Sequence, residues 1–187
     1  RFGGLANHGR SRGRPADARF ADGEVPLMLV VADSSPLIVL IQIGQIDILP
    51  AIFREVVIPP EVSGELSHSK RPQAVREFLA SRPIWLVERA PVAIERIPNL
   101  HAGELAAISL ARELSADLLL IDEVQGRKAA ADRRIPFTGT IGVLELAADR
   151  GLLGLRDAFE RVKKTDFWIS HELLDERLRL YSGRGSL

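Results

Sequence analysis

Two adjacent acids, Asp122 and Glu123, end an apolar run of leucine and isoleucine, and the cations Arg127 and Lys128 follow them. The run is typical of a buried strand, so it delivers two carboxylates to the tip of that strand. Asp33 ends another apolar run in the same way. Because ligands of open parallel α/β sheets bind outside the carboxyl ends of the strands, the two aspartates are predicted to lie at one ligand-binding edge.

Two glutamates are candidates for the same edge. Glu104 lies in the first turn of a helix predicted over residues 102–115, on the apolar side of the helical wheel. A carboxylate that leans toward the core needs a partner, because unpaired burial is costly. Glu65 forms a like-charge pair with Glu61 at i, i+4 spacing, which is unfavourable unless one of the two is engaged elsewhere.

Each acid also has a purely structural interpretation. Asp122 is equally well placed to cap the following helix, with Gln125 in capping-box spacing. Glu104 is stabilised by the helix dipole, and Glu65 taken alone is typical of a solvated helix residue. The capping alternative is weakest for Asp33, because Ser35 is predicted to be the N-cap of a helix that starts at Pro36.

Taken together, the four acids predict a divalent metal centre. Several carboxylates in one cleft repel each other and need a cation to stay ionised together. Oxygen-only ligands favour Mg²⁺ or Mn²⁺ over zinc. Such a centre suits phosphoryl chemistry, in which the metal activates a water and polarises the phosphate. Asp33, Glu104 and Asp122 are the expected metal ligands, and Glu65 completes the expected catalytic set.

The elements that position these acids alternate between strand and helix along the chain. The strands are continuous apolar runs, which predicts a parallel sheet covered by helices on both faces. Expected strands cover residues 28–32, 56–58, 84–88, 118–121 and 135–140. Expected helices follow Pro36 and the Pro59–Pro60 pair and cover residues 73–81, 102–115, 124–134, 141–150, 155–164 and 170–180.

Composition narrows the class of protein. A length of 187 residues fits one domain with a substantial core. Lys and Arg balance Asp and Glu at 25 each, so nucleic-acid contacts would need local patches of charge. The absence of cysteine excludes disulfides, thiolate zinc sites and a cysteine nucleophile, and fits a reducing, cytoplasmic setting. No apolar run approaches the roughly 18 residues of a membrane span.

Residues 1–27 show no helix or strand period, which predicts disorder. The only methionine, Met28, stands where the first strand begins. The upstream stretch is therefore either an artefact preceding the true start or a mobile extension, and the sequence leaves both open.

Four motifs that carry the acids resemble PIN domains in their order and spacing. They are "LVVAD" with Asp33, "PPEVSGEL" with Glu65, "AGELAAISLA" with Glu104 and "LLLIDE" with Asp122. The block "SSPLI" directly after Asp33 and the blocks "IDE--GR--A" and "GTIGVLELA" are similar to those of a bacterial and archaeal PIN-like group. The resemblance covers residues 28–182 and leaves 183–187 as a tail.

The resemblance implies a three-layer α/β/α sandwich with a five-stranded parallel sheet. It also implies an Mg²⁺- or Mn²⁺-dependent endoribonuclease that acts on RNA, as in the VapC toxins of toxin–antitoxin pairs, with a possible antitoxin protein as partner. By the same analogy a homodimer is expected, helped by the apolar segment 37–53, which is more apolar helical surface than one small domain is expected to bury. Glu104 stands where most VapC-like chains have Asp, so the longer side chain is expected to shift the metal.

Three further residues have expected supporting roles. Glu123 is interpreted as an auxiliary acid. Arg127 either pairs with Glu123 at i, i+4, the favoured option, or contacts a substrate phosphate. Thr140 either hydrogen-bonds a ligand carboxylate or caps a helix.

Two other functions compete with the nuclease. One is a non-catalytic PIN-like module that binds RNA or a protein, in which the acids serve structure. The other is a receiver domain, which ranks last because Asp33 is followed by serines and the fifth strand by threonines instead of a lysine.

Overall fold

The computed structural model describes residues 28–184 of the chain. The predictions for residues 1–27 and for the last three residues of the tail lie outside this range. Strands in the described range are β1 (Val30–Ala32), β2 (Val56–Ile58), β3 (Leu86–Glu88), β4 (Leu118–Leu120) and β5 (Phe137–Thr138). Helices are α1 (Ser34–Gln42), α2 (Ile48–Phe53), α3 (Pro60–Ser67), α4 (Gln73–Ala80), α5 (Ala102–Glu113), α6 (Val124–Asp132), α7 (Thr140–Asp149), α8 (Leu155–Val162) and α9 (His171–Arg184).

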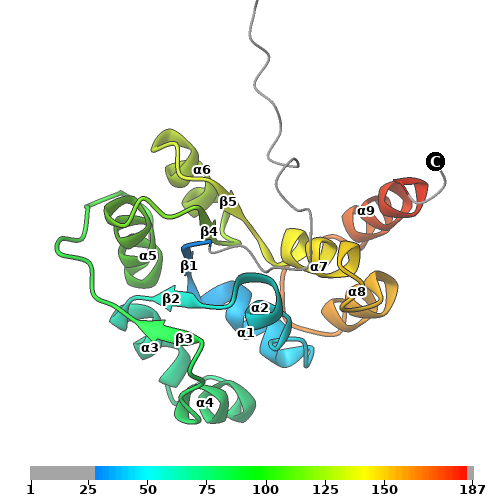
Figure 1. Ribbon diagram of the computed structural model, residues 1–187, viewed down its shortest axis with the longest axis horizontal. Coiled ribbons are helices and arrows are strands. Elements are labelled where there is room, and N and C mark those ends of the chain that lie inside the picture. The colour runs from blue at the N-terminus through cyan, green and yellow to red at the C-terminus, as the bar shows by residue number, and fades with distance from the viewer. Residues whose placement is uncertain (1–27, 185–187) are drawn as a thin grey trace, which may run out of the picture.

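The sheet is parallel throughout its described strands, in the order β3-β2-β1-β4-β5. Alternate residues of the three central strands, β1, β2 and β4, enter different cores. Val30 and Ala32 pack with α1, α2 and α7, whereas Val31 packs with α5 and α6. Figure 1 shows these two groups of helices on opposite sides of the sheet. The predicted α/β/α sandwich with a five-stranded parallel sheet is therefore confirmed.

Helix α1 begins earlier than predicted. Asp33 is its N-cap, and the Oδ2 atom of Asp33 accepts a hydrogen bond of 3.3 Å from the backbone N of Ser35. The prediction that Ser35 is the cap was wrong. Its basis was the assumption that Pro36 must be the first helical residue. The first turn of a helix leaves its N–H groups unbonded, so a proline fits at later first-turn positions as well.

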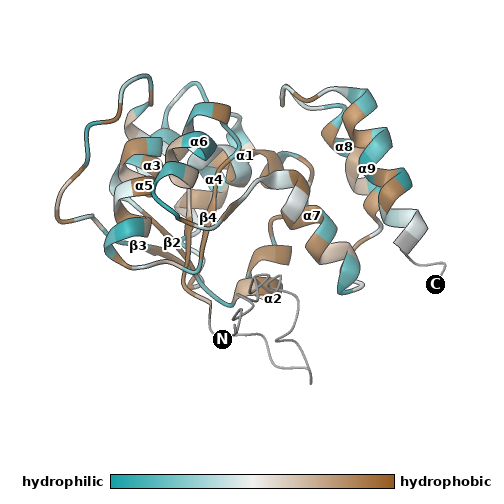
Figure 2. Ribbon diagram, turned by 90° about the horizontal axis from the view of Figure 1, so that it is seen from above, coloured by the Kyte–Doolittle hydropathy of each residue, from teal (hydrophilic) through white to brown (hydrophobic). Residues whose placement is uncertain are grey.

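The apolar segment 37–53 is largely buried within this one chain. Leu37, Leu40, Leu49 and Ile52 are fully buried, and Phe53 almost so. Figure 2 colours most of α2 as apolar. The core that takes up this segment includes residues of α7 and α8, which are distant from it in the sequence. The argument that this surface exceeds what one domain can bury was therefore wrong, and the homodimer stays a prediction without it. Within residues 28–184, no helix has both the length and the apolar character needed to cross a membrane.

The C-terminal helix offers a matched test of packing. Leu174 of α9 is fully buried, whereas the neighbouring Leu173 is 44% exposed. Helices α8 and α9 lie side by side at one end of the molecule (Figure 1, Figure 2). We expect Leu174→Ala to lower the free energy of unfolding by about 2–5 kcal/mol. Leu173→Ala should change it by less than about 0.5 kcal/mol. Urea unfolding measures both, and equal effects would contradict the docking of α9.

Candidate active site

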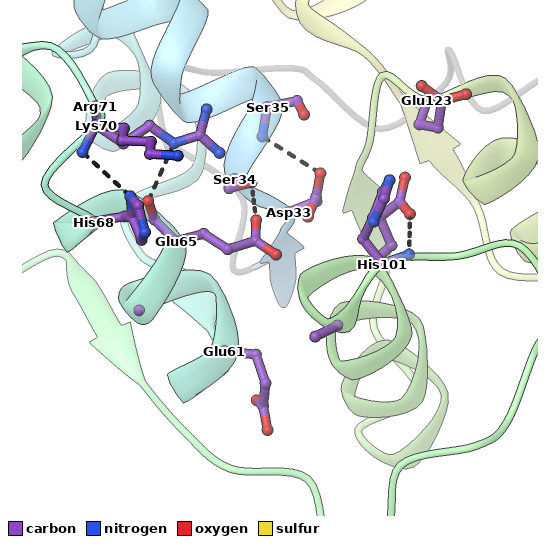
Figure 3. A pocket seen from close by; sticks show the side chains of 13 residues that line it. Asp33, Ser34, Ser35, Glu61, Glu65, His68, Lys70, Arg71, His101 and Glu123 are labelled. Atoms are coloured by element: carbon purple, nitrogen blue, oxygen red, sulfur yellow. Dashed lines mark hydrogen bonds between the residues drawn. The ribbon is translucent and has the colours of Figure 1, made fainter.

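The candidate site lies where the order of the strands reverses. Strand β1 is flanked by β2 on one side and by β4 on the other, and ligands of open α/β sheets bind at the carboxyl end of such a switch point. The backbone N of Asp33 donates to the Leu120 carbonyl oxygen at 2.9 Å, which joins the ends of the two strands. A cleft of about 830 Å³ opens there, and its acidic lining residues are Asp33, Glu61, Glu65, Glu104 and Glu123 (Figure 3).

Asp33 is the most deeply buried acid of this cleft, at 2% exposure. While Oδ2 accepts the capping bond, Oδ1 is buried without a hydrogen-bond partner among the described residues. Burial raises the pKa of Asp33 to about 7, and the nearby charges of Glu65 and Glu104 act in the same direction. An acid with one buried, unpartnered oxygen beside other acids is suited to a cation.

Glu65 connects three helices. Its Oε2 atom accepts a short hydrogen bond from Ser34 Oγ of α1, and its Oε1 atom accepts one of 3.0 Å from the backbone N of Gly103 in α5. A Cβ atom at Gly103 would lie 2.5 Å from Oε1, so a residue without a side chain is required for this approach. Glu65 is thus engaged away from Glu61, whose Oε2 atom is also buried without a partner in the described range.

Glu104 faces both the helix and the cleft. Its Oε2 atom accepts a hydrogen bond of 2.8 Å from the backbone N of His101, the N-cap of α5. The side chain is nevertheless part of the cleft lining, and the residue is 5% exposed. Burial raises the pKa of Glu104, and the charges of Glu123 and Glu65 act in the same direction.

Asp122 is turned toward α7. Its Oδ2 atom accepts a hydrogen bond of 2.6 Å from Thr140 Oγ1, and Oδ1 accepts one of 2.8 Å from the backbone N of Thr140. Arg127 Nη2 lies 3.3 Å from the same Oδ1 atom. Burial raises the pKa of Asp122, while Thr140 and Arg127 act against that rise. Unlike the other three predicted acids, Asp122 is not part of the cleft lining.

The residues around Asp122 decide between alternatives that the sequence left open, and they overturn one favoured pairing. Asp122 does not cap α6, because Glu123 occupies the N-cap position. The favoured pairing of Arg127 with Glu123 was wrong: Arg127 Nε donates to the Ile121 carbonyl at 3.0 Å, which draws its guanidinium back to Asp122. Of the two options for Thr140, the carboxylate bond is the one observed, since the N-cap of α7 is Gly139.

A basic turn borders the acids and was missed in the sequence. His68, Lys70 and Arg71 follow α3 and line the same cleft (Figure 3). Arg71 Nε donates to the Glu65 carbonyl at 3.2 Å, and His68 Nδ1 accepts from the backbone N of Lys70 at 3.2 Å. These bonds hold the turn against the helix that carries Glu65. The stretch "SHSKR" could have indicated a basic turn in the sequence. It belongs to the site only because it is attached to the helix that carries Glu65.

A family model described as a PIN domain matches residues 29–182, which is most of the chain. The chain belongs to the PIN domain family. PIN domains have a nuclease-type fold and generally act as nucleases, and the order of acids along this chain is the one on which the resemblance was based. A search of curated proteins gave no match.

PIN domains typically use divalent metals, and the cleft of this PIN domain suits one in chemistry. Its acids offer carboxylate oxygens, the ligand atoms that Mg²⁺ and Mn²⁺ prefer. Among these, Asp33 Oδ1 is buried and has no hydrogen-bond partner in the described range. As the side chains stand, no three acids or histidines of residues 28–184 are close enough together to hold an ion. Mutual repulsion and the hydrogen bonds of Glu65, Glu104 and Asp122 account for that spacing.

The buried carboxyl of Asp33 predicts a pH dependence of stability in EDTA. Because its pKa rises from 3.8 to about 7 on folding, the folded state binds the proton more tightly than the unfolded chain. The protonated carboxyl thus contributes up to about 4 kcal/mol to the free energy of unfolding at low pH. This contribution is lost as the pH rises to about 7. Asp33→Asn, which keeps a good N-cap, should flatten that decline. Equal pH profiles of unfolding for the two proteins would contradict the burial of Asp33.

Proposed function

We propose that this PIN domain is a metal-dependent endoribonuclease that hydrolyses RNA phosphodiester bonds with Mg²⁺ or Mn²⁺. The observation that carries the proposal is the buried Asp33 carboxylate, one oxygen of which lacks a protein partner in the described range. It lies in a cleft with Glu65 and Glu104 at the switch point of the sheet. A neutral ligand would leave these charges uncompensated, whereas a divalent cation compensates them.

The acids have distinct proposed roles. Asp33 and Glu104 hold the ion, since each is buried and also lines the cleft. Glu65 holds the α1 and α5 ends of the cleft in position through Ser34 and Gly103. When bound, the ion supplies Lewis-acid stabilisation of the phosphate and a water activated for attack.

A polyanionic substrate fits the charges at the rim of the cleft. The chain has no net charge, so RNA contacts require a local basic patch. Lys70 and Arg71 provide one beside Glu65, on the α3 side of the cleft. Phosphates on either side of the cleaved bond would lie along this turn while the acids hold the ion beneath the bond.

The resemblance to VapC toxins extends the proposal to a regulatory context. We propose an antitoxin protein that covers the cleft and a second copy of the chain as partners of the nuclease. The alternative is a non-catalytic PIN-like module. It is favoured by one observation, namely that Glu65, Glu104 and Asp122 already accept hydrogen bonds within the protein.

Cleavage of a fluorescent RNA with Mn²⁺ separates these two functions. We expect Asp33→Asn and Glu104→Gln to lower the rate by about 100-fold or more, because each removes a charge that stabilises the transition state through the ion. Both variants should keep the circular dichroism spectrum of the wild type. Asp149→Asn, an exposed acid at the end of α7 outside the cleft lining, is the matched control and should cleave normally. Full cleavage by both cleft variants, or none by the wild type, would favour the non-catalytic module.

The basic turn is tested by RNA binding in EDTA, where cleavage does not interfere. Lys70→Ala should weaken binding and lower the slope of log K against log[salt] by about 0.7, the value for one lost contact to a single strand. Lys128→Ala is the control, because Lys128 is exposed on α6 outside the cleft lining. Equal effects of the two substitutions would show that RNA does not lie along the 68–71 turn.

A further inference from the structure

The adjacent acids Asp122 and Glu123 have different surroundings. Both oxygens of Asp122 accept hydrogen bonds from Thr140, and Arg127 compensates its charge at 3.3 Å. The Asp122 side chain is only 5% exposed. Thr140 at the start of α7 and the Arg127 guanidinium therefore hold the Asp122 carboxylate at α7 and partly offset the rise that burial causes in its pKa.

The contact between Asp122 and α7 is closely packed. A Cβ atom at Gly139 would lie 2.4 Å from Asp122 Oδ1 and 2.0 Å from Arg127 Nη2. Thr140 is fully buried, so its hydroxyl is shielded from water. Asp122, Arg127, Gly139 and Thr140 thus form a joint, hereafter the β4–α7 joint, that fastens the end of β4 to the start of α7. Turning the carboxylate toward the cleft would break both Thr140 bonds at once.

Glu123 faces the cleft that Asp122 does not reach. It is an exposed residue of the cleft lining, and its charge is close enough to Glu104 to raise the pKa of that acid. Its backbone is extended, with φ −64° and ψ 132°, so the chain does not carry its side chain over the same neighbours as that of Asp122. When Asp122 points to α7, Glu123 therefore points elsewhere. As N-cap of α6 it makes no side-chain capping bond.

We propose that Glu123, not Asp122, is the carboxylate from the end of β4 that acts on the divalent ion with Asp33 and Glu104. Asp122 is a positioning residue whose place is the β4–α7 joint. The inference rests on the proposed metal-dependent function, and it assigns the third acid of that site. The long, exposed Glu123 side chain can move into the cleft when the ion compensates its repulsion from Glu104.

Two measurements on the full chain test these different roles of Glu123 and Asp122: the binding of Mn²⁺ by calorimetry, and the melting temperature in EDTA. Glu123→Gln should weaken Mn²⁺ binding by about tenfold or more, and it should not lower the melting temperature in EDTA, because it removes the repulsion from Glu104. Asp122→Asn should bind Mn²⁺ like the wild type and melt at a lower temperature, because Arg127 loses its charged partner. The asparagine side chain has nearly the same shape, and its amide oxygen can still accept the hydrogen bond from the backbone N of Thr140.

A second variant tests the joint without changing any acid. Thr140→Val removes the hydroxyl at nearly constant volume, so it should lower the melting temperature in EDTA and leave Mn²⁺ binding unchanged. If Asp122 were a ligand, it would have to leave Thr140 to reach the ion, so the loss of this bond would strengthen Mn²⁺ binding instead of leaving it unchanged.

The outcomes separate this inference from the proposed function. If the wild type binds Mn²⁺ and cleaves RNA, but Asp122→Asn abolishes Mn²⁺ binding while Glu123→Gln does not, the inference alone is overturned. If the wild type neither binds Mn²⁺ nor cleaves RNA, the proposed nuclease fails and the metal role of Glu123 fails with it.

Discussion

The burial of acidic side chains at the carboxyl ends of β1 and β4 is the constraint on which the rest of the site depends. A buried carboxylate must be hydrogen-bonded, paired with a cation or protonated. Asp122 is satisfied by Thr140 and Arg127, and Glu65 by Ser34 and Gly103. Asp33 keeps one oxygen without a partner in the described part of the chain, and burial raises its pKa to about 7.

Helix N-termini provide most of this compensation. In a parallel sheet each strand is followed by a helix that starts at the same edge, so N–H groups gather where the acids emerge. The backbone N of Ser35 in α1 bonds Asp33, that of Gly103 in α5 bonds Glu65, and that of Thr140 in α7 bonds Asp122. Each acid is thereby bonded at the positive end of a helix dipole. The topology that brings the acids together also supplies the donors that let the apo protein fold around them.

Local sequence was enough to predict the layers, the strands and the edge where the acids lie, because apolar runs and capping residues act over a few positions. It did not predict contacts between distant segments. Thr140 lies 18 positions from Asp122, and the core that covers segment 37–53 comes from α7 and α8. The start of α1 was misplaced because a first-turn proline does not define the first helical residue. The sequence placed Asp122 at this edge, but it did not predict that the side chain is bonded to Thr140, because only the folded chain brings Gly139 and Thr140 near.

The contrast between Asp122 and Asp33 bears on whether the acids serve structure alone. Asp122 has the surroundings that a structural acid needs: its buried carboxylate accepts two hydrogen bonds from Thr140 and has a guanidinium beside it. Asp33 lacks this compensation at Oδ1, and an unsatisfied buried polar atom costs about 1–3 kcal/mol. A chain under selection for stability alone would gain by supplying a hydrogen-bond donor to Asp33 Oδ1, as it does for Asp122, 89 positions later in the sequence. The cost at Asp33 is offset if the missing partner is an ion that only the working protein binds, and this favours the nuclease over the non-catalytic module.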